Sequence, residues 1–155
     1  MISVRVYGIV LTDDGKIVLS DEYIRGGYYT KFPGGGLEVG EGTRDCLQRE
    51  LMEEMQLKAK IGKHIYTTDF YQQSAFNHAH QILSIYYFAH PEETFSIAFK
   101  EKPFDFLPHQ TANAKGTAEA FRLISYEDIS EESVTLPIDK HVVKMLKSAP
   151  IKSFL

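Results

Sequence analysis

Hydrophobic and polar positions alternate along the chain in short segments that predict strands, and in two longer segments that predict helices. β-Branched and aromatic residues enrich the segments expected to be strands, which are 2–12, 16–22, 31–32, 60–71, 81–89, 94–99 and 119–125. Between Thr43 and Met55, Leu47, Leu51 and Met55 recur every fourth residue, which predicts a helix with one buried stripe. A C-terminal helix is predicted to begin near Pro137, since proline suits the first turn and apolar residues follow at helical spacing.

Two connecting segments carry their own signals. Asp13-Asp14-Gly15 separates the first two expected strands and predicts a hairpin. Residues 100–118 contain two prolines and no clear periodicity, and a loop this long in a compact domain is usually functional or disordered. Its Phe104, Phe106 and His109 suggest either a lid that stacks on a ligand or a simple anchor to the core.

This order of elements predicts one α/β (α+β) domain over residues 1–155, with helices packed on both sides of a mixed β-sheet. No apolar stretch reaches membrane-spanning length, and the N-terminus lacks the features of a signal peptide. Cys46 is the single cysteine, so we expect a packed thiol and a reducing cytoplasm. The net charge of −4, without a basic cluster, argues against a nucleic-acid polymer as partner.

Residues 32–57, FPGGGLEVGEGTRDCLQRELMEEMQL, hold the chemistry of the chain. Glu50, Glu53 and Glu54 fall within an arc of roughly 100° on a helix, where each like-charged pair costs about 0.2–0.5 kcal/mol. A divalent cation such as Mg²⁺ or Mn²⁺ reverses that cost, because it binds clustered oxygens and completes its shell with phosphates. A solvated helix face is the alternative for any one glutamate, but it explains the whole pattern poorly.

The segment resembles the signature box of the Nudix hydrolases, metal-dependent enzymes that cleave a nucleoside diphosphate linked to another group. Gly35, Glu41 and the run Arg49-Glu50-Leu51-Met52-Glu53-Glu54 stand at the family spacing, while Gln56 replaces a glycine. The resemblance implies a Nudix fold, an α/β/α sandwich, with metal held by Glu50, Glu53, Glu54 and a carbonyl at Gly34 or Gly35. It assigns Arg49 an orienting role and makes Glu41 either a metal ligand or a support for one.

Local rules add expectations for this helix. Thr43 is the predicted N-cap, with Asp45 in the first turn. Arg49 lies within ion-pair reach of both Asp45 and Glu53. Gln56 either occupies a left-handed conformation, which costs about 1–2 kcal/mol, or the helix ends in another way.

The expected reaction is attack of metal-activated water on a phosphoanhydride, with Glu53 or Glu54 as general base, or a later carboxylate such as Glu92, Glu93 or Glu119. Phosphate-binding candidates are Arg25, Lys31 and Arg44, and aromatic candidates for a base are Tyr28, Tyr29, Phe70 and Tyr71. The histidines at 78, 80, 90 and 109 and Asn113 stay unassigned. The substrate is left open among nucleoside triphosphates, nucleotide sugars and dinucleoside polyphosphates, and a homodimer is compatible with the sequence.

Two other classes of function stay open. The domain could bind a nucleotide without cleaving it and act as a sensor, since a fold does not fix function. The helix could also be a structural element of a protein–protein adaptor. Metal titration and a hydrolysis assay separate these alternatives from the enzyme.

Overall fold

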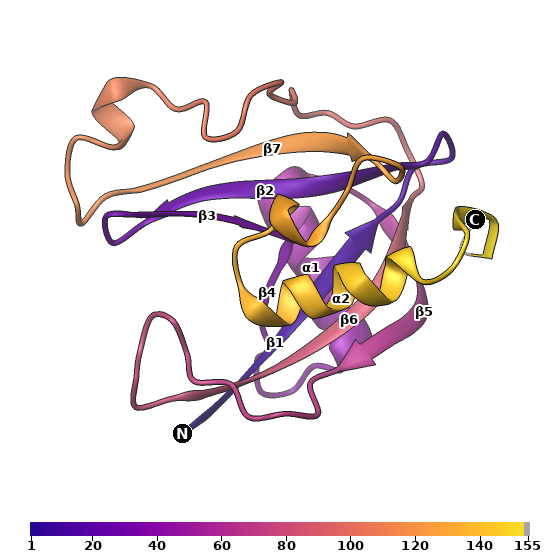
Figure 1. Ribbon diagram of the computed structural model, residues 1–155, viewed down its shortest axis with the longest axis horizontal. Helices are drawn as coiled ribbons and strands as arrows, with labels where there is room; N and C mark the ends of the chain where they lie inside the picture. Colours follow the sequence, from indigo (N-terminus) through magenta and orange to yellow (C-terminus); the bar gives the residue numbers. More distant parts are fainter. Residues whose placement is uncertain (154–155) are drawn as a thin grey trace. The chain divides into compact units, whose positions relative to one another are not determined.

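The computed structural model describes residues 1–153, so the last two residues of the predicted domain lie outside the described part (Figure 1). The chain forms two compact units, each built around one β-sheet. The first unit comprises residues 1–11 and 33–96, and the second comprises residues 12–32 and those from 97 onward. Each unit therefore consists of two stretches of chain that are separated in sequence.

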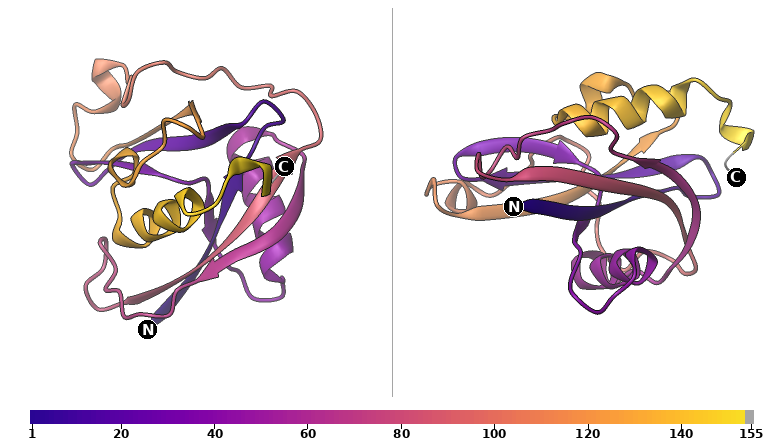
Figure 2. Two further views of the ribbon diagram at one scale, coloured as in Figure 1. Left: turned by 45° about the vertical axis from the view of Figure 1, so that its right-hand side comes forward. Right: turned by 90° about the horizontal axis from the view of Figure 1, so that it is seen from below.

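The first unit holds a four-stranded mixed sheet and the helix of the signature segment. Its strands are β1 (Ile2–Val10), β4 (Gly34–Gly36), β5 (Ala59–Thr67) and β6 (Gln81–Pro91), in the order β4-β1-β6-β5. β1 runs parallel to β6, whereas the other two pairs are antiparallel. Helix α1 (Thr43–Met55) lies on one side of these strands, as the turned views in Figure 2 show.

The core of the first unit is made where α1 meets the sheet. Leu47, Leu51 and Met55 have no exposed surface, which confirms the predicted stripe. Strand β1 supplies Val6 and Val10, which are also fully buried. Burial of such side chains contributes about 1.5–3 kcal/mol each, so this contact fixes the position of the helix. At the outer edge, the pairing of β5 with β6 shifts register near His64.

The second unit holds a three-stranded antiparallel sheet. Its strands are β2 (Lys16–Ile24), β3 (Gly27–Lys31) and β7 (Thr117–Ser125), in the order β3-β2-β7. Between β6 and β7 the chain has no regular structure except the short 3-10 helix η1 (Pro108–Gln110). Two further short 3-10 helices are η2 (Glu131–Ser133) and η3 (Ile151–Ser153).

Helix α2 (Pro137–Lys147) begins at the predicted proline, and it buries the apolar residues Ile138, Val142, Val143 and Leu146. Its end is held by the hydroxyl of Tyr126, which donates to the carbonyls of Leu146 and Ala149. This side chain satisfies acceptors that the helix terminus would otherwise leave to solvent. No helix within residues 1–153 is long and apolar enough to cross a bilayer.

Three sequence predictions need correction. Gly15, at φ +83°, does sit in a turn, but β1 and β2 join different sheets and form no hairpin. Residues 94–99 form no strand, and the chain has two sheets where one was expected. The glycine turn includes the short strand β4, which pairs with β1. The fold class itself, a mixed α+β structure with two helices, is confirmed.

Candidate functional site

The N-cap of helix α1 lies one residue before the predicted one. Gly42 is the N-cap and Thr43 is the first helical residue, so the Thr43 prediction is wrong. The carboxylate of Asp45 accepts from the backbone N–H of Gly42 at 3.3 Å, whereas the hydroxyls of Thr43 and Tyr87 lie 2.7 Å apart. Strand β6 therefore fixes the start of the helix through the side chain expected to cap it.

Arg49 is the centre of a network of carboxylates. Its Nε and Nη2 donate to the two oxygens of Glu41 at 3.0 and 2.7 Å. Its Nη1 lies 3.0 Å from Glu50 and 3.3 Å from Glu53, and Nη2 also donates to the carbonyl of Gly36 at 3.1 Å. The predicted ion pair with Glu53 is present, while Asp45 is engaged at the helix start. Such a fork fixes the orientation of several carboxylates at once.

The protonation of this network follows from its hydrogen bonds. The two bonds from Arg49, and the backbone N–H of Glu38, lower the pKa of Glu41 to about 2. The same contact with Glu41 raises the pKa of Arg49. Burial raises the pKa of the Cys46 thiol to about 12, so this cysteine is a packed neutral group, as predicted, rather than a nucleophile. The Arg49–Glu41 pair stays charged at any physiological pH.

Gly35 lets the backbone of β4 approach the carboxylate of Glu50. A Cβ at this position would lie 2.4 Å from the Glu50 carboxyl carbon and Oε1. At Gly34, whose φ is +150°, a Cβ would lie 2.1 Å from the carbonyl oxygen of Val6. Only glycine fits at these two positions, and Gly35 brings main-chain groups next to a carboxylate whose side chain is 14% exposed. The close approach predicted from the sequence is therefore present.

The other two metal-ligand candidates lie one turn further along α1. The side chain of Glu53 is 59% exposed, and Glu54 is half-buried. Within residues 1–153, no three acidic, histidine or cysteine side chains lie close enough to form a preassembled metal site. Even so, a carboxylate against a glycine backbone, with further carboxylates on the same helix, is an oxygen donor set that suits Mg²⁺ or Mn²⁺. The residues present fit such an ion once Glu53 or Glu54 turns toward Glu50.

Helix α1 ends at Gln56 in the left-handed conformation, at φ +50° and ψ +34°. The N–H of Gln56 donates to Met52 and that of Leu57 donates to Leu51, which closes the helix as a glycine normally would. Of the two alternatives for this position, the structure shows the strained one. No candidate ligand is displaced by it.

Arg44, a candidate phosphate ligand, makes contacts with β5 and β6. Its Nη1 donates to the carbonyl of Ile61 at 3.0 Å, and its guanidinium lies 4.8 Å from the ring centroid of Tyr87. His64 meets the edge of the same ring at 5.6 Å. These contacts tie the first turn of α1 to β5 and β6, so the charged end of Arg44 serves packing in this structure.

The other two basic candidates belong to the second unit. Arg25 is exposed in the turn between β2 and β3, at φ +51°. Lys31 is 7% exposed, and its Nζ lies 2.7 Å from Oε2 of Glu22. Its charge is therefore already engaged by a carboxylate on the neighbouring strand.

Glu22 faces Glu119 directly across the β2–β7 pair, a contact that the sequence did not reveal. Glu119 is an exposed residue overall, but its carboxyl end turns inward, where Ser20 donates to it at 3.1 Å. Burial of that end, together with the hydrogen bond and charge of Glu22, raises the pKa of Glu119 to about 8. The other two later carboxylates proposed as a general base, Glu92 and Glu93, are exposed.

The remaining aromatic and histidine candidates are scattered. Phe70 and Tyr71 are 40% and 70% exposed in the loop before β6, and Tyr28 is 49% exposed on β3. His78 is exposed, and His80 lies 3.3 Å from the side-chain amide of Asn77. The pattern His78-x-His80 therefore does not form a metal pair.

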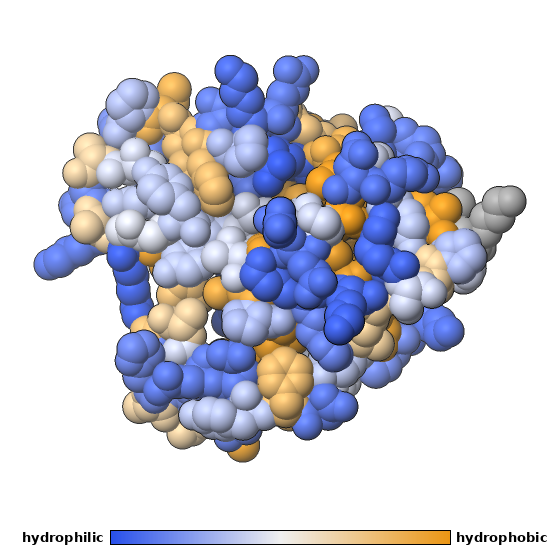
Figure 3. Space-filling view, viewed as in Figure 1, coloured by the Kyte–Doolittle hydropathy of each residue, from blue (hydrophilic) through white to orange (hydrophobic). Residues whose placement is uncertain are grey.

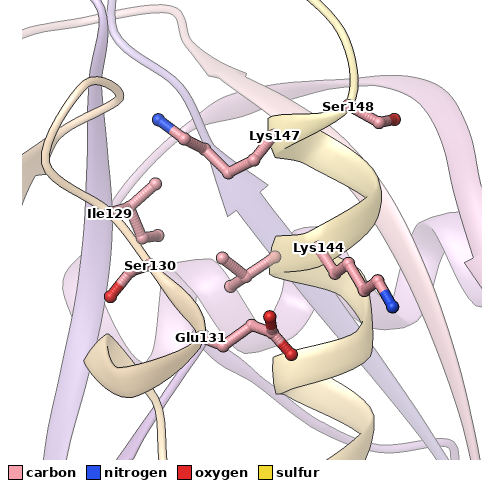
Figure 4. Close-up of a pocket in the computed structure, with 7 residues that line it drawn as sticks. Ile129, Ser130, Glu131, Lys144, Lys147 and Ser148 are labelled. Carbon is pink, nitrogen blue, oxygen red and sulfur yellow. The ribbon is translucent and has the colours of Figure 1, made fainter.

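Helix α2 also borders a groove with a volume of about 310 Å³, lined by Ile129, Ser130, Glu131, Val143, Lys144, Lys147 and Ser148 (Figure 4). Lys147 reaches across it and donates to the carbonyls of Tyr126 and Glu127, while Lys144 points away. On the face shown in Figure 3, hydrophilic residues predominate and hydrophobic residues form small groups between them. Neither feature adds a catalytic group.

The sequence and the structure were compared with those of known proteins. No curated protein matches the sequence. Among solved structures, a MutT structure described for Aliivibrio salmonicida and Vibrio cholerae is 21% identical, with a TM-score of 0.56 over 96% of this chain and 98% of that one. A NUDIX hydrolase from Nitrosomonas europaea is 18% identical, with a TM-score of 0.65 over 100% and 97%. An ADP-ribose pyrophosphatase from Streptococcus suis is 16% identical, with a TM-score of 0.53 over 94% and 90%.

These structures share the fold of the chain at low identity. The model of the NUDIX domain matches residues 1–146, which include the signature segment and most of both units. The chain belongs to the Nudix family of pyrophosphohydrolases.

Proposed function

We propose that this protein is a metal-dependent hydrolase that cleaves the phosphoanhydride of a nucleoside diphosphate linked to another group. The observation that carries the proposal is the contact of Glu50 with the backbone of Gly35, beside carboxylates that Arg49 holds in place. A structural helix has no need of a strand made of three glycines against one of its glutamates. A ligand cluster does, because carboxylate and main-chain oxygens must come close together.

Each residue of the site has a distinct part in the proposal. Glu50, Glu53 and Glu54, with a carbonyl at Gly34 or Gly35, would hold Mg²⁺ or Mn²⁺. The bound ion would neutralise charge on the phosphates and lower the pKa of a water molecule. Arg49 orients Glu50 and Glu53, and Glu41 fixes the guanidinium from its far side. Arg49 and Glu41 are thus positioning residues.

The general base is proposed among the carboxylates of the helix. The side chain of Glu53 is 59% exposed, and its Oε2 lies 3.3 Å from Nη1 of Arg49. Glu54 is the other option on the helix. Glu119 has a raised pKa that suits proton transfer near neutral pH, which keeps it as a third candidate.

The proposal extends to the class of substrate, the cellular location and the assembly. The solved relatives include proteins named MutT and ADP-ribose pyrophosphatase, so the trial panel should contain nucleoside triphosphates and ADP-ribose as well as dinucleoside polyphosphates. The single buried cysteine fits a reducing cytoplasm. A small nucleotide, rather than a nucleic-acid polymer, is the proposed partner, and a homodimer remains to be tested.

The proposal is tested by measuring phosphate release from this panel with Mg²⁺ or Mn²⁺. We expect hydrolysis of at least one compound, and a loss of at least about a hundredfold in Glu53→Gln or Glu54→Gln with an unchanged thermal midpoint in the absence of metal. Glu101→Gln, the same change at an exposed glutamate outside α1, is the control and should be neutral. Nucleotide binding without hydrolysis would instead identify a sensor, and a thermal midpoint that does not respond to metal would leave only a structural helix.

A further inference from the structure

The second unit contains a cavity of about 330 Å³ that the proposed hydrolysis does not use. Its walls come from β3, from the loop between β6 and β7, from β7 and from the segment before α2. The residues that line it are Tyr28 and Thr30 on β3, Pro103 and Phe104 in the loop, Arg122 and Ile124 on β7, and Glu132, Ser133 and Thr135 before α2. Ligand pockets generally range from about 300 to 1,000 Å³. This one is at the small end, so it fits a single ring system rather than a whole dinucleotide.

One wall of the cavity is aromatic. Tyr28 is 49% exposed, although its ring has two aromatic neighbours. The ring centroid of Tyr23 lies 5.2 Å from that of Tyr28, and the ring of Phe104 packs edge to face against Tyr28 with the centroids 5.3 Å apart. An exposed tyrosine held between two aromatic neighbours loses little freedom when a ligand stacks on it. Such surfaces bind flat rings, since stacking is available to any planar π system.

Arg122 and Glu132 are the charged residues of the cavity lining, and the charge of Arg122 is already neutralised. Arg122 donates through Nε and Nη2 to the two oxygens of Asp21, at 2.5 and 2.9 Å, and Asp21 is fully buried. Asp21 also accepts from the hydroxyl of Thr30 and from the backbone N–H of Phe104. Among residues 1–153, Nη1 of Arg122 has no partner and remains a donor. The ion pair therefore offers a hydrogen bond without a net positive charge, which favours a neutral acceptor over a phosphate.

Two hydroxyls supply further donors. The Oγ1 of Thr135 accepts from the backbone N–H of Thr30 at 2.8 Å, and the Oγ of Ser133 accepts from that of Ser130 at 3.0 Å. Each hydroxyl keeps its own hydrogen for another partner. The cavity thus presents donors from Arg122, Ser133 and Thr135 beside its aromatic wall, together with the carboxylate of Glu132 as an acceptor. This set matches an uncharged ring that carries both acceptor and donor atoms.

Phe104, which forms part of this wall, has a left-handed backbone conformation that residues other than glycine rarely adopt. Its φ is +54°, and the bond from its N–H to Asp21 and the bond from Phe106 N–H to its carbonyl keep it there. Positive φ at a bulky residue persists only where surrounding contacts impose it, and such residues cluster at binding sites. Here the result is that the Phe104 ring packs edge to face against Tyr28, beside the ion pair.

We propose that this cavity binds the uncharged heteroaromatic ring of a small ligand, of nucleobase size, by stacking on Tyr28 and Phe104 and by donation from Arg122, Ser133 and Thr135. The site lies wholly in the second unit and uses none of the carboxylates of α1. It therefore stands or falls independently of the proposed hydrolysis.

The test titrates the full-length, ¹⁵N-labelled protein with adenosine, guanosine, cytidine and uridine in EDTA. Nucleosides carry no phosphate and no metal is present, so a diphosphate site cannot produce the signal. We expect saturable amide shifts at residues 28–31, 104–106, 122 and 132–135 for at least one nucleoside. Tyr28→Ala and Phe104→Gly should each raise its dissociation constant about tenfold or more, the loss of one stacking contact. Glycine adopts positive φ freely, so the second variant removes the ring without adding strain.

Tyr71→Ala, which removes a tyrosine that is 70% exposed in the first unit, is the matched control and should bind like the wild type. The proposal is overturned if no nucleoside gives saturable shifts or if the shifts lie outside the lining residues. It is equally overturned if both cavity variants bind as tightly as the wild type. The wild-type titration alone decides the first two outcomes, even if a variant fails to fold.

Discussion

The closest test of the site's geometry is Gly35→Ala. The added methyl would lie 2.4 Å from the carboxyl carbon of Glu50, whereas ordinary contacts begin at 3.4 Å. The carboxylate must therefore retreat by about 1 Å, which would separate it from the backbone of β4. A displacement of 1 Å in a catalytic arrangement can cost about a hundredfold in rate. We expect a loss of that size in turnover.

The same substitution should leave the fold intact. The atoms that the methyl meets belong to the far end of a flexible side chain, and Gly35 has no positive φ. The free energy of unfolding should therefore change little, by less than about 1 kcal/mol, as for substitutions that avoid the packed core. A loss of activity without a loss of stability is the signature of a displaced ligand.

The assay compares Gly35→Ala with Gly36→Ala. At Gly36 an added methyl would meet only Nη1 of Arg5, at the ordinary distance of 3.7 Å. Phosphate release from whichever compound the wild type hydrolyses gives the rate, and the thermal midpoint as a function of Mn²⁺ concentration gives the metal response. Wild-type turnover in Gly35→Ala, or an equal loss in both variants, would refute the role of this contact.

Three further changes test other parts of the structure. Gln56→Gly should raise the free energy of unfolding, measured by urea denaturation, by about 0.5–1 kcal/mol, because relief of the left-handed strain exceeds the entropy cost of glycine. Gln56→Ala keeps the Cβ and should show no such gain. Arg49→Lys should lower activity about 10–100-fold, since one ammonium cannot hold both Glu41 and Glu50, and a wild-type rate would contradict its positioning role. Glu119→Gln should flatten the pH dependence of stability. Because the pKa of Glu119 is raised to about 8 in the folded state, the contribution of Glu119 to stability is fully present below about pH 5 and is lost as pH rises from about 5 to 8. Urea melts in which both proteins show the same change in stability across this range would disprove the effect.

The features predicted correctly are those set by local sequence. The stripe of Leu47, Leu51 and Met55 follows from helical spacing alone, and so does the reach from Arg49 to Glu53. The glycine approach to the helix follows from the absence of side chains. Each of these depends on residues close together in the chain, or on a sterically unique residue.

The errors concern partners distant in sequence. Thr43 has the chemistry of a cap, but Tyr87, brought by β6, takes its hydroxyl. The ion pair of Lys31 with Glu22 was likewise not predicted, because it depends on the pairing of β2 with β3. The false hairpin has the same origin, because the turn at Gly15 is local whereas the choice of sheet is made elsewhere. Strand register decides these contacts, and no pattern within a single segment encodes register.

The division of each unit into two stretches of chain has a consequence for synthesis on the ribosome. β1 pairs with β6, so Ile2 finds its partner only after Gln81 has been synthesised. In the same way, β2 pairs with β7, and Lys16 finds its partner only after Ser125 has been synthesised. Neither sheet can be completed until most of the polypeptide has emerged, and pairings of such long sequence separation form slowly. A nascent chain stopped at residue 96 would hold every strand of the first sheet, together with an unfinished β2–β3 edge exposed to aggregation.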